Sequence, residues 1–188
     1  LCELEKVACP SAGSCGGQFT ANTMACVAEA IGLALPGSSS TPAPYESRDK
    51  YAYDSGSKVM DLINMQLKPR DIVNKKSLIN AARIVACSGG STNAALHLPA
   101  LANEIGIDFD ILDVAEIFKE TPYIADLKPG GTYLAKDLHD IGGVPILMKA
   151  LLDGGFLDGS CLTVSGKTIQ ENLKSINVDY KNQKILIL

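Results

Sequence analysis

The sequence has no run of basic residues, no long hydrophobic run and no tryptophan, and its formal net charge is -4. Without a basic patch, nothing in the chain attracts nucleic acid or an anionic membrane surface. No apolar stretch reaches the roughly 18 residues that a membrane-spanning helix needs. We therefore expect no nucleic-acid partner and no membrane partner.

Disulfide and targeting signals are also missing. The six cysteines follow no spacing typical of a disulfide framework, and the chain is too long for a disulfide-stapled mini-domain. Residues 1–10 lack the charged and then apolar layout of a signal peptide. This pattern favours a reducing setting, either the cytoplasm or an organelle stroma or matrix. Because the chain begins with Leu1 rather than Met, we expect its natural N-terminus to lie upstream.

What is present is a globular composition with helical periodicity. Hydrophobic residues make up 46% of the chain and charged residues 20%, as in an ordinary packed domain. Apolar residues recur at helical spacing in seven segments, namely 18–35, 54–67, 75–87, 94–105, 113–121, 146–152 and 166–173. Short apolar runs at 109–112, 123–127 and 162–164 are typical of strands. Their alternation with helices predicts an α/β fold with a partly parallel sheet.

The most informative motif surrounds Cys15, which lies in a glycine-rich turn just before the first long helical segment. The positive end of the following helix favours a thiolate at such a place. Gly13, Gly16 and Gly17 let the backbone approach a bound group closely. The sulfur would then be a metal ligand, a cluster ligand or a nucleophile. The alternative is that Cys15 is a small buried apolar residue, as free cysteines usually are.

Three other cysteines are weaker candidates for a metal ligand or a nucleophile. Cys26 falls among apolar residues of the predicted helix over 18–35, Cys87 ends the helix over 75–87, and Cys161 begins an apolar run. We interpret all three as packing residues.

A second polar cluster, Ser91, Thr92 and Asn93, follows Gly89 and Gly90 and precedes the helix over 94–105. A glycine-rich turn that leads into a helix start can hold an anion. Serine, threonine and asparagine are also the ordinary N-cap residues, so capping alone would explain the pattern. We treat these three side chains as possible lining of a functional cleft and leave both interpretations open.

Taken together, the motifs resemble those of one enzyme family. The segment at 8–24 is similar to the cysteine motif of the dihydroxy-acid dehydratase family, whose members carry an iron–sulfur cluster. Four further blocks resemble family motifs in the family's order, at 89–98, 125–130, 137–145 and 161–168. The resemblance covers essentially residues 7–173. Because five blocks occur in the same order as in the family, the probability of a chance match is very small.

The resemblance implies a fold and a domain division. It places residues 1–173 in a helix-rich, cluster-binding N-terminal domain. Residues 174–188 would be a linker and the start of a C-terminal, β-barrel-like domain, because an apolar strand begins at 184–188 where the chain stops. By the same resemblance the chain is an internal fragment of a longer enzyme that forms a homodimer. We expect the fragment to be inactive alone.

The resemblance also implies a reaction. Enzymes of this type remove water from a 2,3-dihydroxy acid to give a 2-keto acid in valine and isoleucine biosynthesis. The cluster acts there as a Lewis acid for the departing hydroxyl. Cys15 matches the last of three cysteine ligands. The other two cysteines, the Mg²⁺ ligands and the serine base would lie outside this chain, so no catalytic residue is expected within it.

Two positions bear on the subtype. Ala12 stands where some family members have an extra cysteine, which favours a [2Fe–2S] over a [4Fe–4S] cluster. Gln18 replaces a more usual methionine, and either side chain could line the mouth of the site. One alternative is a sugar-acid dehydratase of the same superfamily, acting on an aldonate or a phosphogluconate. The other is a non-catalytic structural module in which the cysteines only pack.

Overall fold

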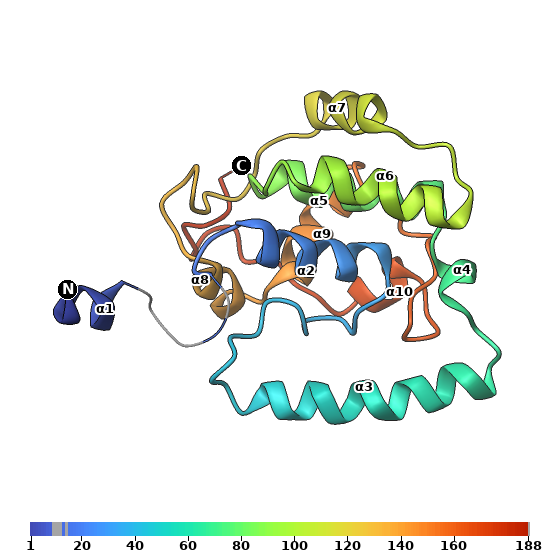
Figure 1. Cartoon of the computed structure of the whole chain (residues 1–188), viewed down its shortest axis with the longest axis horizontal. Helices are drawn as coiled ribbons and strands as arrows, with labels where there is room; N and C mark the ends of the chain where they lie inside the picture. The colour runs from blue at the N-terminus through green and yellow to red at the C-terminus, as the bar shows by residue number, and fades with distance from the viewer. Residues whose placement is uncertain (9–12, 14, 188) are drawn as a thin grey trace.

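The computed structural model describes residues 1–8, 13 and 15–187 of the chain. Helices dominate the described residues (Figure 1). Their bounds are α1 Cys2–Val7, α2 Thr20–Ile31, α3 Ser47–Asn64, α4 Pro69–Ile72, α5 Lys75–Cys87, α6 Ala94–Ile105, α7 Ile111–Glu120, α8 Ala135–Asp140, α9 Val144–Asp153 and α10 Ile169–Leu173.

The core forms around α2 and α5, which pack against each other, with α6, α7 and α9 on their flanks. The α5 sequence repeats apolar residues at helical spacing, so that Leu78, Ile84 and Val85 are all buried. Leu98 of α6 and Leu147 of α9 are fully buried in the same core. The α2 helix is thereby fixed along one side of the core. Residues 15–19, here called the Cys15 turn, lie directly before its first residue.

Side-chain caps explain why two of the helices begin where they do. Before α5, the Asn74 side chain accepts the N–H of Ser77 at 3.0 Å, and Ser77 Oγ accepts the N–H of Asn74 at 2.9 Å. Asp110 and Asp113 make the same reciprocal arrangement at the start of α7. Such boxes satisfy backbone donors that the first helical turn leaves unpaired. The predicted bounds of α5 and α6 agree with the structure.

The end of α2 depends on Gly32. This residue has a left-handed backbone with φ of 96°, and its N–H donates to the carbonyls of Ala28 and Glu29. A Cβ at this position would lie 2.8 Å from the carbonyl oxygen of Leu162. Glycine is therefore required both by the backbone conformation and by the close approach of the 162–164 segment.

Helix α3 lies apart from the core, as Figure 1 shows along the lower edge of the molecule. It begins at Ser47 and ends at Asn64, earlier at both ends than the predicted 54–67, and none of its residues is buried. Tyr53, Met60 and Ile63 are among its exposed large side chains.

The expected partly parallel sheet is not seen among the described residues, where pairing is limited to isolated bridges. Ala125 pairs with Leu186 and Leu162 with Thr168, both antiparallel, and Leu127 pairs with Tyr133. The backbone of 123–127 is instead satisfied by scattered partners, since the N–H groups of Ile124 and Ala125 both donate to Cys87 O. The described chain is thus helix-rich with almost no strand.

The strand predicted at 109–112 is wrong, because α7 begins at Ile111. The short apolar run fits either structure, and the cap formed by Asp110 favours the helix.

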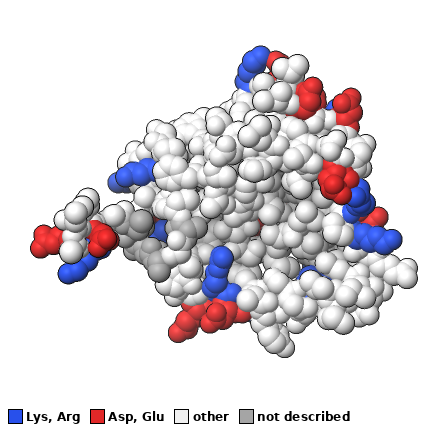
Figure 2. Space-filling view, viewed as in Figure 1, with Lys and Arg blue, Asp and Glu red and all other residues white. Residues whose placement is uncertain are grey.

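Charged side chains lie mainly around the periphery of the face in Figure 2, and its centre, over α2 and α6, is largely uncharged. No helix in the described parts of the chain is both long enough and apolar enough to cross a membrane.

Candidate functional site

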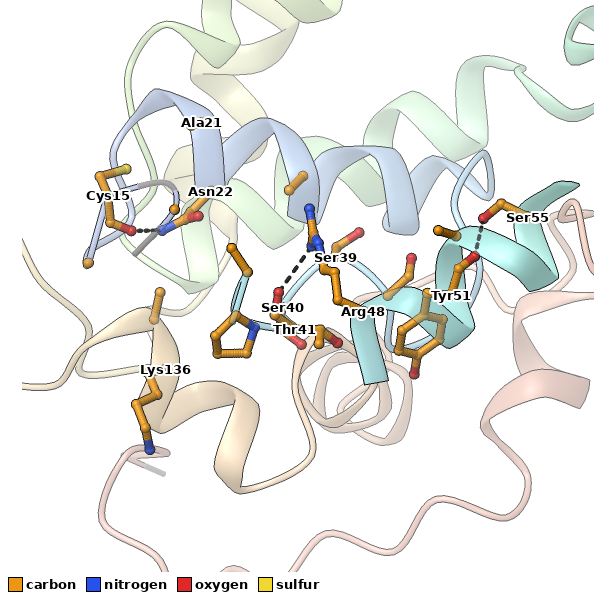
Figure 3. A pocket seen from close by; sticks show the side chains of 18 residues that line it. Cys15, Ala21, Asn22, Ser39, Ser40, Thr41, Arg48, Tyr51, Ser55 and Lys136 are labelled. Atoms are coloured by element: carbon orange, nitrogen blue, oxygen red, sulfur yellow. Dashed lines mark hydrogen bonds between the residues drawn. The ribbon is translucent and has the colours of Figure 1, made fainter. Parts of the chain in front are cut away.

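A cleft of about 660 Å³ opens beside Cys15. One wall is the Cys15 turn together with Ala21, Asn22 and Ala25 of α2. The other walls come from residues 38–43, from the first turns of α3 and from the start of α8. Figure 3 shows the Cys15 turn on one side of the cleft and Arg48, Tyr51 and Ser55 of α3 on the other. Segments that are far apart in the sequence thus meet beside the Cys15 motif.

Cys15 is partly exposed and lines this cleft. Its Sγ lies 3.7 Å from the carbonyl oxygen of Gly17, within the same turn. The turn is held from outside, since the N–H of Gln18 donates to Lys128 O at 2.6 Å and that of Ala135 donates to Gly16 O at 2.8 Å. The sulfur is therefore accessible from the cleft on a backbone tied to two other segments.

The core cysteines differ from Cys15 in burial. Burial raises the pKa of Cys26 to about 12 and that of Cys161 to about 11, and it raises the pKa of Cys87 further still. These three thiols stay protonated near neutral pH and pack as apolar groups, as their sequence context predicts.

A thiol that is open to a cleft suits a cluster ligand, and Cys15 fits that role by its donor chemistry. The described residues contain no group of three or more His, Cys, Asp or Glu side chains placed to hold a metal ion. A cluster bound by Cys15 would therefore need further ligands from outside the described residues. Ala12, on which the expected cluster type depends, lies outside the described residues.

The wall opposite Cys15 is rich in hydroxyl groups. Ser38, Ser39, Ser40 and Thr41 follow one another along it, and Arg48 Nη1 donates to Thr41 O at 3.0 Å. Ser40 Oγ is buried and has no hydrogen-bond partner among the described residues.

Charge in the cleft has one sign. Arg48 and Lys136 are the charged residues in the described lining, and Lys136 Nζ forms an ion pair with Asp140, which lies outside that lining. Hydroxyl groups beside two cations suit an oxygen-rich anion.

Behind this wall lies Glu29, a buried carboxyl on α2 that is 4% exposed. Its Oε1 accepts the N–H of Gly37 at 2.6 Å and its Oε2 accepts the N–H of Ser39 at 3.3 Å. Burial raises the pKa of Glu29 to about 7, even though both backbone hydrogen bonds act to lower it. The Glu29 side chain thus fixes the backbone of the hydroxyl-rich wall of the cleft.

Ser91, Thr92 and Asn93 lie beside the first turn of α2, outside the lining of the cleft described above. Asn93 Nδ2 donates to Thr20 Oγ1 at 2.6 Å, and the N–H of Ser91 donates to Thr23 Oγ1 at 2.9 Å. Asn93 makes no side-chain cap to α6. The cluster therefore connects α6 to the start of α2, and a role in lining a cleft of the whole enzyme stays a prediction.

These contacts predict that substitution of Asn93 lowers stability more than substitution of Thr92. Asn93→Ala should lower the free energy of unfolding by about 1 kcal/mol, because it removes the hydrogen bond to Thr20. Thr92 is exposed, so Thr92→Ala should change stability by less than about 0.5 kcal/mol. Thermal melts beside steady-state kinetics on the whole enzyme will test this. A rise in KM for Thr92→Ala without a loss of stability would instead show contact with substrate.

Gln18, which could have lined the mouth of the site, is buried instead. It is 1% exposed, and its Nε2 lies 3.6 Å from Cys26 Sγ. Its side chain points into the core, because Cys26 on the following helix offers the amide a partner there.

Sequence reasoning missed Asn22, Glu29 and Arg48 as residues of the site. Asn22 and Glu29 lie in a helix interpreted only as core, and Arg48 lies ahead of the predicted start of α3. One signal was available, since Glu29 is the lone charged residue in the apolar sequence of α2. A single charge on an otherwise apolar helix suggests a specific buried partner.

Comparison with known proteins gives consistent results. The family model for the dihydroxy-acid/6-phosphogluconate dehydratase N-terminal region matches residues 1–172. A dihydroxy-acid dehydratase of Pelagibacter ubique is 69% identical over 186 residues, which is 99% of this chain and 32% of that protein. Dihydroxy-acid dehydratase 2 of Bradyrhizobium diazoefficiens is 68% identical over 176 residues, 94% of this chain and 31% of that protein.

More distant relatives agree. A dihydroxy-acid dehydratase of an Arthrobacter species is 48% identical over 186 residues, 99% of this chain and 32% of that protein. The chain therefore spans about a third of the length of the curated relatives that it matches. The matched region includes the Cys15 turn, the segment at 38–43 and α3, which together form the cleft. The chain belongs to the dihydroxy-acid/6-phosphogluconate dehydratase family.

Proposed function

We propose that this chain is part of a hydro-lyase that dehydrates 2,3-dihydroxy carboxylic acids to 2-keto acids in valine and isoleucine biosynthesis. The observation that carries the proposal is the cleft. It joins one partly exposed cysteine to a wall of hydroxyl groups and two cationic side chains, with no acidic residue in the described lining. A dihydroxy acid has a carboxylate and two hydroxyl groups, which such a surface can bind. The names of the relatives support the same reaction.

Cys15 would be one ligand of an iron–sulfur cluster. When bound, that cluster supplies an electrophilic iron that assists loss of a hydroxyl group. The chain's own residues would bind and orient the substrate. The Arg48 guanidinium would attract the carboxylate, and Lys136, whose ammonium group pairs with Asp140, would add a weaker positive potential.

The remaining parts of the site would come from elsewhere in the full-length enzyme. These are two further cysteines, the Mg²⁺ ligands and the base that takes the C2 proton. We propose a [2Fe–2S] cluster and a homodimer for that enzyme. The face over α2 and α6 is largely uncharged (Figure 2), and exposed large apolar side chains such as Leu96 and Leu101 of α6 support burial of that helix in a larger assembly.

We also propose that residues 1–173 form part of the cluster-binding domain and that 174–188 lead into a second domain. The parallel bridge between Leu127 and Tyr133 supports a partly parallel sheet in the whole protein, built onto the 123–127 segment, and the antiparallel bridge between Ala125 and Leu186 would add an antiparallel neighbour to it. A backbone that pairs at a single bridge here leaves neighbouring groups able to pair with further strands.

The test is substrate choice by the full-length enzyme, purified and assayed without oxygen. We expect keto-acid formation from a branched 2,3-dihydroxy acid with kcat/KM at least about 100-fold above that for an aldonate or for 6-phosphogluconate. A higher kcat/KM for either sugar acid would replace this proposal with the sugar-acid dehydratase. Absence of turnover with all three acids, in a folded and iron-loaded enzyme, would contradict both.

A further inference from the structure

Two carbonyl groups of the Cys15 turn point at one side chain. Asn22 Nδ2 donates to the carbonyl oxygen of Cys15 at 2.6 Å and to that of Gly17 at 2.7 Å, as Figure 3 shows for the first bond. A side-chain amide has two N–H donors, and here they hold the backbone on both sides of Gly16. Both bonds are partly buried, which shields them from competing water.

We propose that Asn22 is the positioning residue that fixes Cys15 for cluster binding. The inference rests on the proposed role of Cys15 as an iron ligand. The other described ties act at Gly16 and Gln18, whose backbone groups bond to Ala135 and Lys128. Asn22 acts on the peptide of Cys15 itself, and so on the direction in which its Cα–Cβ bond points.

The position of Asn22 on α2 makes this restraint rigid. It is the third residue of the helix, whose following turns are packed into the core through Cys26, Val27 and Ala30. A short side chain on an anchored helix transmits that rigidity to the turn over a few ångströms. Ligand positioning of this kind affects metal retention without changing the identity of any ligand.

Substitution can separate positioning from support of the helix. Asn22→Asp keeps the size of the side chain but replaces two donors with a carboxylate that faces two carbonyl oxygens. A negative charge in the first turn of a helix favours the helix itself, so α2 is retained while the turn is released. Asn22→Ala removes the donors without adding charge. The matched controls are Asn103→Asp and Asn103→Ala, at an exposed position on α6.

The first measurement needs no cluster. In iron-free full-length enzyme, the alkylation of Cys15 by iodoacetamide is followed by mass spectrometry over a range of pH. Rates are compared at the high-pH plateau, where the thiolate is fully formed and charge effects on ionisation drop out. We expect both Asn22 variants to react about tenfold faster than wild type and both Asn103 variants to match it.

The second measurement uses the reconstituted enzyme. Release of iron to a chelator should be about tenfold faster in Asn22→Asp and Asn22→Ala, with an altered visible or electron paramagnetic resonance spectrum. If Asn22 only stabilises α2, the melting temperature will fall while the alkylation plateau and iron release stay at wild-type values. That result would overturn the inference.

The two proposals fail in different ways. If wild-type enzyme binds no iron at all, the proposed cluster is wrong, whereas the alkylation rates still report whether Asn22 fixes the turn. If iron is bound but neither Asn22 variant changes its release, the cluster stands and the positioning role does not. Should Asn22→Ala fail to fold, Asn22→Asp gives the answer, because its charge favours α2.

Discussion

Replacing Cys15 by serine should remove nearly all cluster iron from the full-length enzyme and lower kcat by at least about 100-fold. A hydroxyl is a far poorer iron ligand than a thiolate, so a cluster that has lost one of its cysteines is not retained. Iron analysis, visible absorbance and keto-acid formation measure the effect together.

The matched controls are Cys26→Ser and Cys87→Ser, because both thiols are buried in the core at 4% and 0% exposure. Each variant places a hydroxyl in an apolar setting and should lower stability by about 1 to 3 kcal/mol. The folded fraction of either variant should nevertheless bind iron as wild type does. Normal iron content in Cys15→Ser, or loss of iron from a well-folded Cys26→Ser, would contradict the assignment of Cys15.

The sequence carries enough information to locate Cys15, because glycines and a following helix are local features. The same holds for α5 and α6, where periodicity and flanking polar residues lie within the predicted segments. The segments that face Cys15 across the cleft could not be predicted from such local features. The wall at 38–43 and the first turns of α3 reach the cleft only through packing, and no local pattern states which loop will face which helix.

The errors in the predicted strands have a related cause. In the short apolar runs 123–127 and 162–164 most residues are buried or half-buried, as expected for strands, and Tyr123 is exposed. A strand also needs a neighbour, however, and that neighbour is set by the rest of the chain. Here the N–H of Val164 donates to Gly32 O and that of Ile124 to Cys87 O, both at helix ends. Burial could be predicted from composition, whereas the pairing could not.

Stability should also depend on pH through Glu29, whose folded-state pKa of about 7 lies above the ordinary value of 4.5. Between these two pH values the folded protein keeps a proton that the unfolded chain has released. The free energy of unfolding therefore falls as pH rises through this window, and the full penalty above pH 7 is about 3 kcal/mol. Below pH 4.5 both states are protonated, and Glu29 contributes no pH dependence.

Glu29→Gln should remove this dependence, because an amide does not ionise. The amide can accept only one of the N–H groups of Gly37 and Ser39 through its oxygen, and its NH₂ group faces the other. We therefore expect the variant to be less stable than wild type below pH 4.5. The difference should shrink or reverse above pH 7, where wild type carries a buried charge.

The measurement is the apparent melting temperature of the full-length enzyme at several pH values from about 4 to about 8, which span the window set by the two pKa values, with Glu46→Gln as the control for loss of an exposed carboxyl. Infrared difference spectra add a local readout, since a protonated Glu29 gives a carboxylic-acid carbonyl band that Glu29→Gln lacks. Because Glu29 holds the backbone of Gly37 and Ser39, KM should rise in Glu29→Gln as well. Parallel pH profiles for wild type and Glu29→Gln, with no difference in the carbonyl band, would show that Glu29 is ionised throughout and that its burial does not control the wall of the cleft.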